Sequence, residues 1–167
     1  MSYVRKHLLE GESIAYETRL HWIVLIGPVV TALLFALTGI LLFVLAARDG
    51  AEQTPVHQAK LVAGAVLLLI AVVFIVRGVL QRNSTEMTVT NRRVFIKTGL
   101  AARRTIELLL SRIESIGVEE SATGRMMGFG SVTIHGTGGT PEVFHNVARP
   151  LEFRTQVQQQ IEKTLGR

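Results

Sequence analysis

A long uncharged stretch constrains this chain more than any other feature. Residues 22–47 are 26 consecutive positions without a charged side chain. A helix needs about 20 apolar residues to cross the hydrocarbon core of a bilayer, so this stretch is long enough to span it. Trp22 lies at its beginning, where an indole is stable at the membrane–water interface, and Arg48 follows its end. The stretch therefore predicts a transmembrane helix.

A second apolar stretch, residues 61–80, predicts a partner helix. Lys60 precedes it and Arg77 lies near its far end, where long basic side chains extend to the interface. We therefore expect Lys60 and Arg77, together with Trp22, at the membrane interface. The polar link between the two stretches is short, which predicts a helical hairpin. The small residues that would let its helices approach each other closely are Ala32, Ala36, Ala59 and Ala63.

Basic residues predict which side of the membrane each end of the chain faces, because Lys and Arg concentrate in cytoplasmic loops. The leading segment carries three of them, Arg5, Lys6 and Arg19, and the link has only two. From residue 81 onward the chain has 12 Lys and Arg against 8 Asp and Glu. Both termini are therefore expected in the cytoplasm. In a soluble protein this basic excess would suggest nucleic acid, but beside two spans it indicates the inner side of a bilayer, so we expect no nucleic-acid partner.

The residues before the first span alternate between apolar and polar. From Ser13 to Trp22 this pattern is typical of a strand with one buried face. A single strand is not stable alone, so it would have to pair with the part of the chain after residue 80. The alternative is an irregular approach to the membrane.

After residue 80, short alternating runs are separated by turn residues. Six runs predict antiparallel strands: 84–90, 93–98, 103–110, 113–120, 131–136 and 141–147. Pro150 suits the first position of a helix, and apolar residues then recur along one side up to Leu165. One amphipathic helix over a bent sheet would bury both apolar faces.

The sequence thus predicts a membrane α + β protein: a two-helix transmembrane hairpin and a β roll of six to seven strands capped by a C-terminal helix. The expected parts are a cytoplasmic N-terminal segment 1–21, a hairpin 22–80 with helices 22–47 and 61–80, and a cytoplasmic domain 81–167.

Several motifs, taken together, resemble the bacterial pleckstrin-homology (PH)-like membrane proteins. They occupy residues 12–22, 88–99, 104–108, 113–116, 124–134 and 136–139. The resemblance implies a PH-like roll of seven strands with a C-terminal helix, held beneath a two-helix anchor as a multi-pass protein of the bacterial inner (plasma) membrane. PH domains that bind phosphoinositides use a long basic first hairpin loop, whereas the corresponding turn here, residues 90–93, is tight. Specific phosphoinositide binding is therefore not expected.

Strand direction predicts a basic and partly apolar rim near the membrane. The chain leaves the second span at about Ser84, so alternate turns of the sheet return toward the bilayer. The candidate lipid- or partner-binding residues on this rim are Lys97, Leu100, Arg103, Arg104, Arg125, Met126, Met127 and Arg149. Cations beside anionic lipid would press the domain onto the inner leaflet. The alternative is that these cations only solubilise hairpin ends, with the two methionines buried in the sheet.

No pattern predicts catalysis. The chain has no cysteine, its histidines lack a third ligand at coordinating spacing, and no Ser, His and Asp occur in a triad context. We therefore expect neither an enzyme, a metal site nor a cofactor. The predicted function is a membrane-anchored binding or assembly module that recruits an unidentified membrane protein or forms a homo-oligomer, with anionic lipid as a further contact. The alternative is an accessory subunit of a transport or export complex.

Overall fold

The computed structural model of the chain describes residues 8–49, 54–99, 104–164 and 166. The chain divides into two compact units. The helical unit is Trp22–Leu80, and the sheet unit combines Met1–His21 with Gln81–Arg167. The sheet unit is therefore discontinuous in sequence, because the helical unit is inserted after its first strand.

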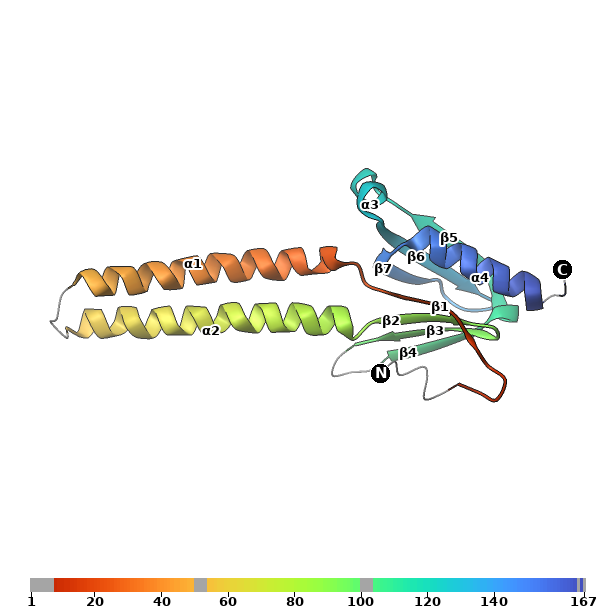
Figure 1. Cartoon of the computed structure of the whole chain (residues 1–167), viewed down its shortest axis with the longest axis horizontal. Helices are drawn as coiled ribbons and strands as arrows, with labels where there is room; N and C mark the ends of the chain where they lie inside the picture. Colours follow the sequence, from red (N-terminus) through yellow and green to blue (C-terminus); the bar gives the residue numbers. More distant parts are fainter. Residues whose placement is uncertain (1–7, 50–53, 100–103, 165, 167) are drawn as a thin grey trace. The chain divides into compact units, whose positions relative to one another are not determined.

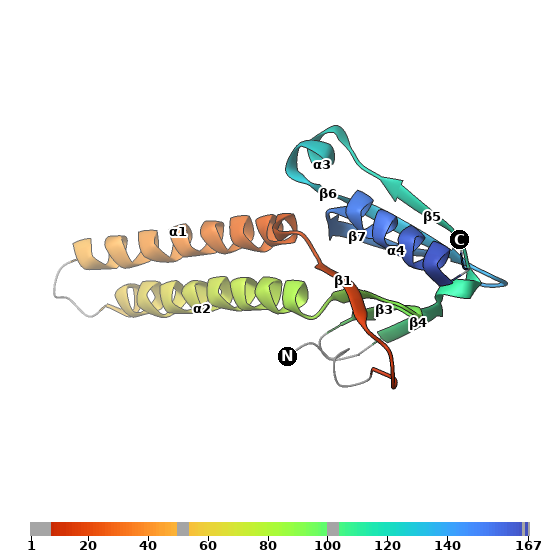
Figure 2. The ribbon, with the colours of Figure 1, turned by 45° about the vertical axis from the view of Figure 1, so that its right-hand side comes forward.

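In its described residues the helical unit consists mainly of two long helices, which lie side by side in Figures 1 and 2. A short 3₁₀ segment, Trp22–Leu25, leads into α1, Ile26–Arg48, and α2 spans Pro55–Asn83. Helix α2 begins six residues before the predicted start at residue 61. The hydroxyl of Thr54 accepts a hydrogen bond from the His57 amide at 3.2 Å, and Pro55 takes the first helical position, where its missing N–H costs no bond.

Small residues at seven-residue spacing bring the two helices together. The buried positions are Ala32, Gly39 and Ala46 on α1 and Gly64, Ala71 and Gly78 on α2. At the middle of this contact a Cβ on Gly64 would lie 3.0 Å from the carbonyl oxygen of Gly39. The prediction from four-residue spacing was therefore wrong for Ala59 and Ala63, which are exposed, while Ala36 is half-buried. A seven-residue period keeps one seam in contact along helices that coil around each other, which four-residue spacing does not.

Among the residues that the structure describes, seven antiparallel strands form the sheet unit. The first sheet has the order β1-β2-β3-β4, with β1 at Ile14–Arg19, β2 at Glu86–Thr90, β3 at Arg93–Thr98 and β4 at Arg104–Leu109. The second has the order β5-β6-β7, with β5 at Ile113–Glu119, β6 at Phe129–Gly136 and β7 at Glu142–Ala148. A 3₁₀ turn, Leu110–Arg112, leads from β4 to β5, and an isolated bridge between Leu20 and Val147 joins the sheets on the other side.

The leading segment is a strand rather than an irregular approach. It pairs antiparallel with β2, from Ile14 opposite Thr90 to Arg19 opposite Glu86. Its hydrogen bonds are thus supplied by residues about 70 positions later in the chain. The N-terminal segment and the domain after residue 80 fold as one unit.

The core lies between the two sheets and helix α4, Pro150–Thr164, which crosses the second sheet (Figure 2). Phe153 and Val157 of α4 are fully buried. They pack against buried strand residues from both sheets: Met87, Val89, Val94, Ile96, Val132, Ile134 and Val147. The predicted antiparallel β roll with its C-terminal helix is confirmed.

Candidate binding surface

A short helix that the sequence did not predict stands between β5 and β6 (Figures 1 and 2). Helix α3 spans Ala122–Met127. The Ser121 hydroxyl accepts a hydrogen bond from the Gly124 amide at 3.0 Å, which caps its start, and Gly128 ends it in the left-handed conformation with φ 77°. A Cβ on Gly124 would lie 2.5 Å from the carbonyl oxygen of Phe129, so glycine is required where α3 folds back on β6. The capping serine at 121 and the glycine at 128 are visible in the sequence and could have predicted this helix.

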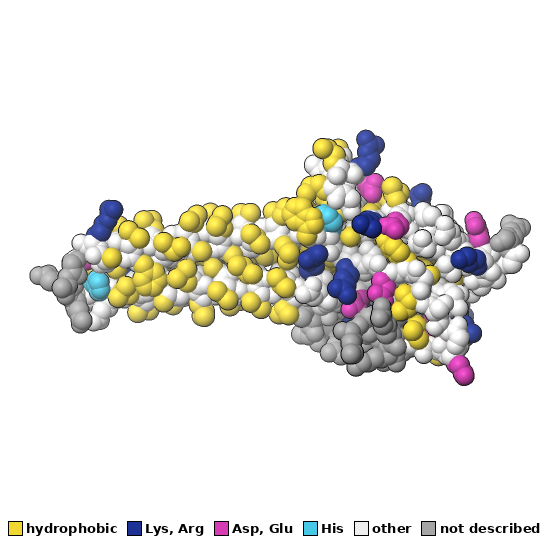
Figure 3. Space-filling view, in the orientation of Figure 1, with side chains coloured by type: hydrophobic (Ala, Val, Ile, Leu, Met, Phe, Trp, Pro, Cys, Tyr) yellow, Lys and Arg dark blue, Asp and Glu magenta, His cyan; other side chains and the backbone are white. Residues whose placement is uncertain are grey.

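The two methionines of α3 face solvent. The side chain of Met126 is 88% exposed and that of Met127 is 40% exposed. The alternative in which they are buried in the sheet was therefore wrong. Figure 3 shows hydrophobic and basic side chains beside each other on α3. Arg125 contributes an exposed cation to this group.

His21, two residues after β1, contacts α3 and the start of β6. Its ring stacks on Phe129 with centroids 5.2 Å apart, and its backbone amide donates to the Asn146 carbonyl at 2.7 Å. The ring also hydrogen-bonds the backbone of Met127. Burial lowers the pKa of His21, the charge of Arg82 lowers it further, and the Met127 hydrogen bond opposes both. The imidazole is therefore mainly neutral at pH 7. Its contacts with Met127 and Phe129 connect the segment after β1 to α3.

The two points where the chain leaves the sheet unit lie at this same corner. The chain exits after His21 and returns at Gln81. The Nε of Arg82 lies 3.5 Å from the Leu20 carbonyl oxygen, at the limit of a hydrogen bond. Since His21 contacts α3 directly, the first connection lies next to α3, and the side chain of Arg82 reaches the first connection from the second.

Arg149 adds a second exposed cation to the α3 corner. Its amide donates to the Gly128 carbonyl at 2.9 Å, and it adopts a positive φ of 50°. Its side chain is 74% exposed and lies 3.6 Å from Glu152, a weak surface pair. The structure thus brings together four of the predicted rim residues. We call this group the α3 corner: Arg125, Met126, Met127 and Arg149.

Two other predicted rim residues, Lys97 and Arg104, lie in the first sheet. Lys97 sits in β3 opposite Glu86 and Thr105. Arg104 pairs with Glu142 at 2.6 Å, at the beginning of β7, whereas Arg149 follows the end of that strand. The predicted residues outside the described ranges are Leu100 and Arg103.

The three residues predicted at a membrane interface belong to the helical unit. Trp22 is half exposed, Arg77 is exposed on α2, and Lys60 forms an ion pair with Asp49 at 2.7 Å. Trp22 and Arg77 lie near the helix ends that connect to the sheet unit, and Lys60 lies near the link between the helices. The interface role of all three stays a prediction.

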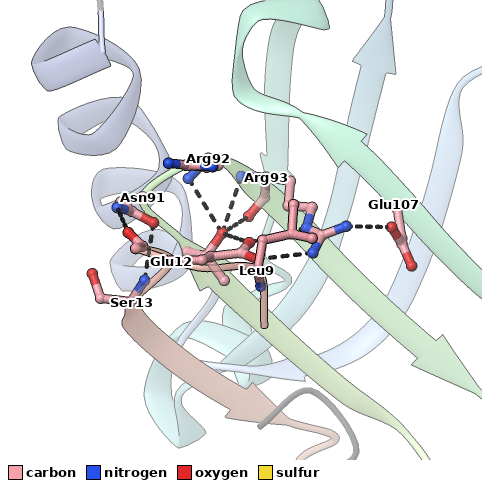
Figure 4. Close-up of polar contacts among 9 residues, drawn as sticks. Leu9, Glu12, Ser13, Asn91, Arg92, Arg93 and Glu107 are labelled. Atoms are coloured by element: carbon pink, nitrogen blue, oxygen red, sulfur yellow. Dashed lines mark hydrogen bonds and ion pairs between the residues drawn. The ribbon is translucent and has the colours of Figure 1, made fainter. Parts of the chain in front are cut away.

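Sequence reasoning missed a buried ion pair that attaches the N-terminal segment to the first sheet (Figure 4). The side chain of Glu12 is fully buried, and Arg93 donates to both of its carboxylate oxygens, at 2.9 and 2.8 Å. Thr90 and the Leu9 amide donate to the same carboxylate. Arg93 also donates to Glu107 at 2.8 Å. No sequence pattern links residues 81 positions apart.

This ion pair changes the titration of Glu12. The Arg93 hydrogen bonds, partly opposed by burial, lower the pKa of Glu12 from 4.5 to about 2. Next to it, the Asn91 side chain accepts from the Ser13 amide and donates to the Gly11 carbonyl. The tight β2–β3 turn is therefore bound to the protein's own N-terminal segment.

The described residues offer no metal centre. Within them, no group of three or more His, Cys, Asp or Glu side chains is arranged to hold a metal ion. The Ser131 hydroxyl and His145 Nδ1 are 3.0 Å apart on exposed strand positions. In a serine triad the histidine Nδ1 binds the acid and Nε2 binds the serine. Here Nδ1 binds the serine, so the contact is an ordinary surface hydrogen bond.

The family model for the bacterial PH domain matches residues 23–161. The chain belongs to the bacterial PH domain family. The match includes both long helices and all strands except β1, so it covers most of the two units. PH domains are generally binding modules and not enzymes, which fits a binding or assembly role for this chain.

Two solved structures resemble this one weakly. A DUF1696-family protein with a pleckstrin-homology domain from Shewanella loihica PV-4 is 12% identical, with a TM-score of 0.39, covering 46% of this chain and 70% of that one. The DH/PH domains of PDZ-RhoGEF, in complex with activated RhoA, are 5% identical, with a TM-score of 0.30, covering 78% of this chain and 53% of that one. No curated protein matches the chain significantly. The family assignment therefore rests on the family model.

Proposed function

We propose that the chain is a bacterial inner-membrane protein whose helices α1 and α2 span the bilayer. They hold the PH-like sheet unit at the cytoplasmic leaflet, where it acts as a binding or assembly module. The observation that carries this proposal is the surface of the two helices.

Large apolar side chains cover the outside of α1 and α2, as Figure 3 shows on one face. Only 17% and 11% of the residues in their most apolar windows are buried within the structure. A core helix of a soluble protein would be mostly buried, so these two need an apolar solvent around them. The spans of 27 and 29 residues are about 40 Å long at 1.5 Å per residue, more than the roughly 30 Å of a bilayer core.

Within the described ranges, the sheet unit offers a partner two unpaired strand edges. In the part of the chain that the structure describes, nothing pairs with the outer edge of β4 or of β5. An extended segment of another protein can add to such an edge through main-chain hydrogen bonds. Confinement to the leaflet raises the effective concentration of the module for a partner in the same membrane. A second copy of this chain would use the same edges to form a homo-oligomer.

Topology reporters test the anchor. We expect the full chain to be extracted from bacterial membranes only by detergent. A cytoplasmic reporter should be active when fused at Arg167, and an extracytoplasmic reporter when inserted at Gly50, because basic residues favour the cytoplasmic side. Release of the protein by salt or alkaline wash, or cleavage of the sheet unit by protease added outside intact spheroplasts, would contradict the proposal.

Affinity purification from detergent distinguishes the modes of assembly. If the chain forms a homomeric scaffold, we expect to recover only copies of the chain. If it recruits a partner, we expect to recover a membrane protein in less than stoichiometric amount. A second membrane transport protein at fixed stoichiometry would instead make the chain an accessory subunit.

Replacing Gly64 by leucine should weaken the helical hairpin by about 1–3 kcal/mol, since four added heavy atoms meet the Gly39 carbonyl and the Phe43 ring. The measurement is reversible unfolding in mixed micelles, followed by helical circular dichroism. Ala63→Leu adds similar bulk on the exposed neighbour and should change stability little. Equal stability of the two variants would contradict the close contact between α1 and α2 at Gly64.

A further inference from the structure

The α3 corner places exposed apolar and basic side chains next to His21, where the chain first leaves the sheet unit. Met126 is the most exposed large apolar residue of the described chain, at 88%. Arg125 precedes it, and Arg149 is held against the end of α3 by the Gly128 carbonyl. An apolar side chain flanked by cations matches the boundary between lipid head groups and acyl chains.

The position of the α3 corner indicates that the bilayer surface covers it. The His21 ring contacts the Met127 backbone and Phe129, and residue 22 already begins the first apolar segment. Adjacent Cα atoms are about 3.8 Å apart, so the exit corner cannot move far from the surface that the first span enters. The second connection, at Arg82, lies beside the first. A bilayer holding the spans is therefore always within reach of α3.

Acidic residues near α3 make charge alone an insufficient explanation. Glu119 and Glu120 precede it, and Glu152 lies near Arg149. These carboxylates partly offset the attraction that the arginines have for anionic lipid. The exposed methionines are then the decisive feature, since an unbranched thioether side chain adapts its shape to an irregular apolar medium.

We propose that α3 is an interfacial anchor: Met126 and Met127 insert between lipid head groups at the cytoplasmic leaflet, and Arg125 binds lipid phosphate. This inference deepens the proposed function and rests on it. The His21 contacts hold α3 in the inserting position, so the sheet unit is docked on the leaflet at a third point besides its two chain connections. Its unpaired β4 and β5 edges are then presented to partners in a fixed orientation.

The chain has no cysteine, so single labelling sites can be introduced cleanly. The test uses the full chain in vesicles of phosphatidylcholine and phosphatidylglycerol, with an environment-sensitive fluorophore at Met126→Cys. Spin-labelled lipids in the vesicles quench probes at the depth of the label. Thr140→Cys is the control in the sheet unit, because Thr140 is exposed in the β6–β7 turn, at the opposite end of β6 from α3. Leu41→Cys, on the exposed side of α1, reports on the spans.

The probe at position 126 should emit at shorter wavelength than the probe at 140. Spin labels placed near the lipid head groups should quench most of its fluorescence. Quenching at 41 together with a water-like, unquenched probe at 126 would overturn the inference and leave the proposed function standing. No quenching at 41 would overturn both. A blue-shifted but unquenched probe at 126 would mean that protein covers α3, which also overturns the lipid assignment.

A charge variant tests the phosphate contact. In vesicles with phosphatidylglycerol, Arg125→Gln should lower the ratio of quenched to unquenched probe at position 126 about fivefold, the effect of one cation near an anionic surface. Arg112→Gln is the matched control, because Arg112 is exposed and its carbonyl accepts from the Thr137 amide in the β6–β7 turn, at the opposite end of β6 from α3. Equal effects of the two variants would overturn the role of Arg125.

Discussion

Replacing Arg93 by methionine should destabilise the sheet unit by about 3–5 kcal/mol at pH 7, because it leaves the buried carboxylate of Glu12 without its partner. Methionine preserves much of the apolar stem that packs near Phe95, whose ring centroid lies 4.3 Å from the guanidinium. The loss therefore reports mainly on the charge. Denaturation of the full chain in detergent, followed by hydrogen exchange of the sheet amides, measures it.

Arg92→Met is the matched control for Arg93. It removes the same charge from the neighbouring residue, which is exposed. Surface substitutions of this kind usually change stability by less than about 0.5 kcal/mol. Equal losses in the two variants would mean that net charge, and not the pair with Glu12, stabilises the turn.

The same ion pair predicts a pH dependence with a definite sign. The pKa of Glu12 is lowered from 4.5 to about 2 in the folded protein, so its contribution is present above pH 4.5 and is lost as the pH falls toward 2. A shift of this size corresponds to about 3 kcal/mol. The stability deficit of Arg93→Met should therefore shrink as the pH falls from 5 to 2. A deficit that stays constant would contradict the pairing.

Truncating Phe153 to alanine should cost about 3–5 kcal/mol, since its fully buried ring lies between α4 and both sheets. Small domains are stable by only about 5–15 kcal/mol, so this change removes a large part of the total. Loss of α4 packing would also expose the apolar faces of both sheets. The expected observation is a lower unfolding midpoint with faster hydrogen exchange in both sheets.

Leu151→Ala is the control on the same helix. Leu151 is half exposed, and its truncation should cost less than about 1 kcal/mol. Hydrogen exchange that changes only in α4 after Phe153→Ala would contradict a core shared by the two sheets.

Several parts of the architecture were predictable because they depend on local pattern. The apolar length of residues 22–47, the alternation of the strands and the Pro150 helix each repeat within a few residues. The strand from Ile14 to Arg19 was also visible as alternation, but its pairing with β2 required the folded chain. The motifs resembling the bacterial PH family were confirmed by the family model.

The candidate site was predictable only in part. Strand direction brought Arg125, the two methionines and Arg149 to one rim, and the structure groups these four. The same reasoning placed Arg104 with them, although it pairs with Glu142 at the beginning of β7. Alternation gives the direction of a strand but not how a bent sheet folds over its neighbour.

The sequence by itself determined the two apolar helices, the strand order along the chain and the amphipathic C-terminal helix, because periodicity and length are properties of neighbouring residues. Only the tertiary structure decided that Glu12 is buried against Arg93, that Gly39 meets Gly64 and that His21 contacts Met127. The physical reason is that burial and ion pairing depend on side chains distant in sequence, whose approach is fixed by packing of the whole core.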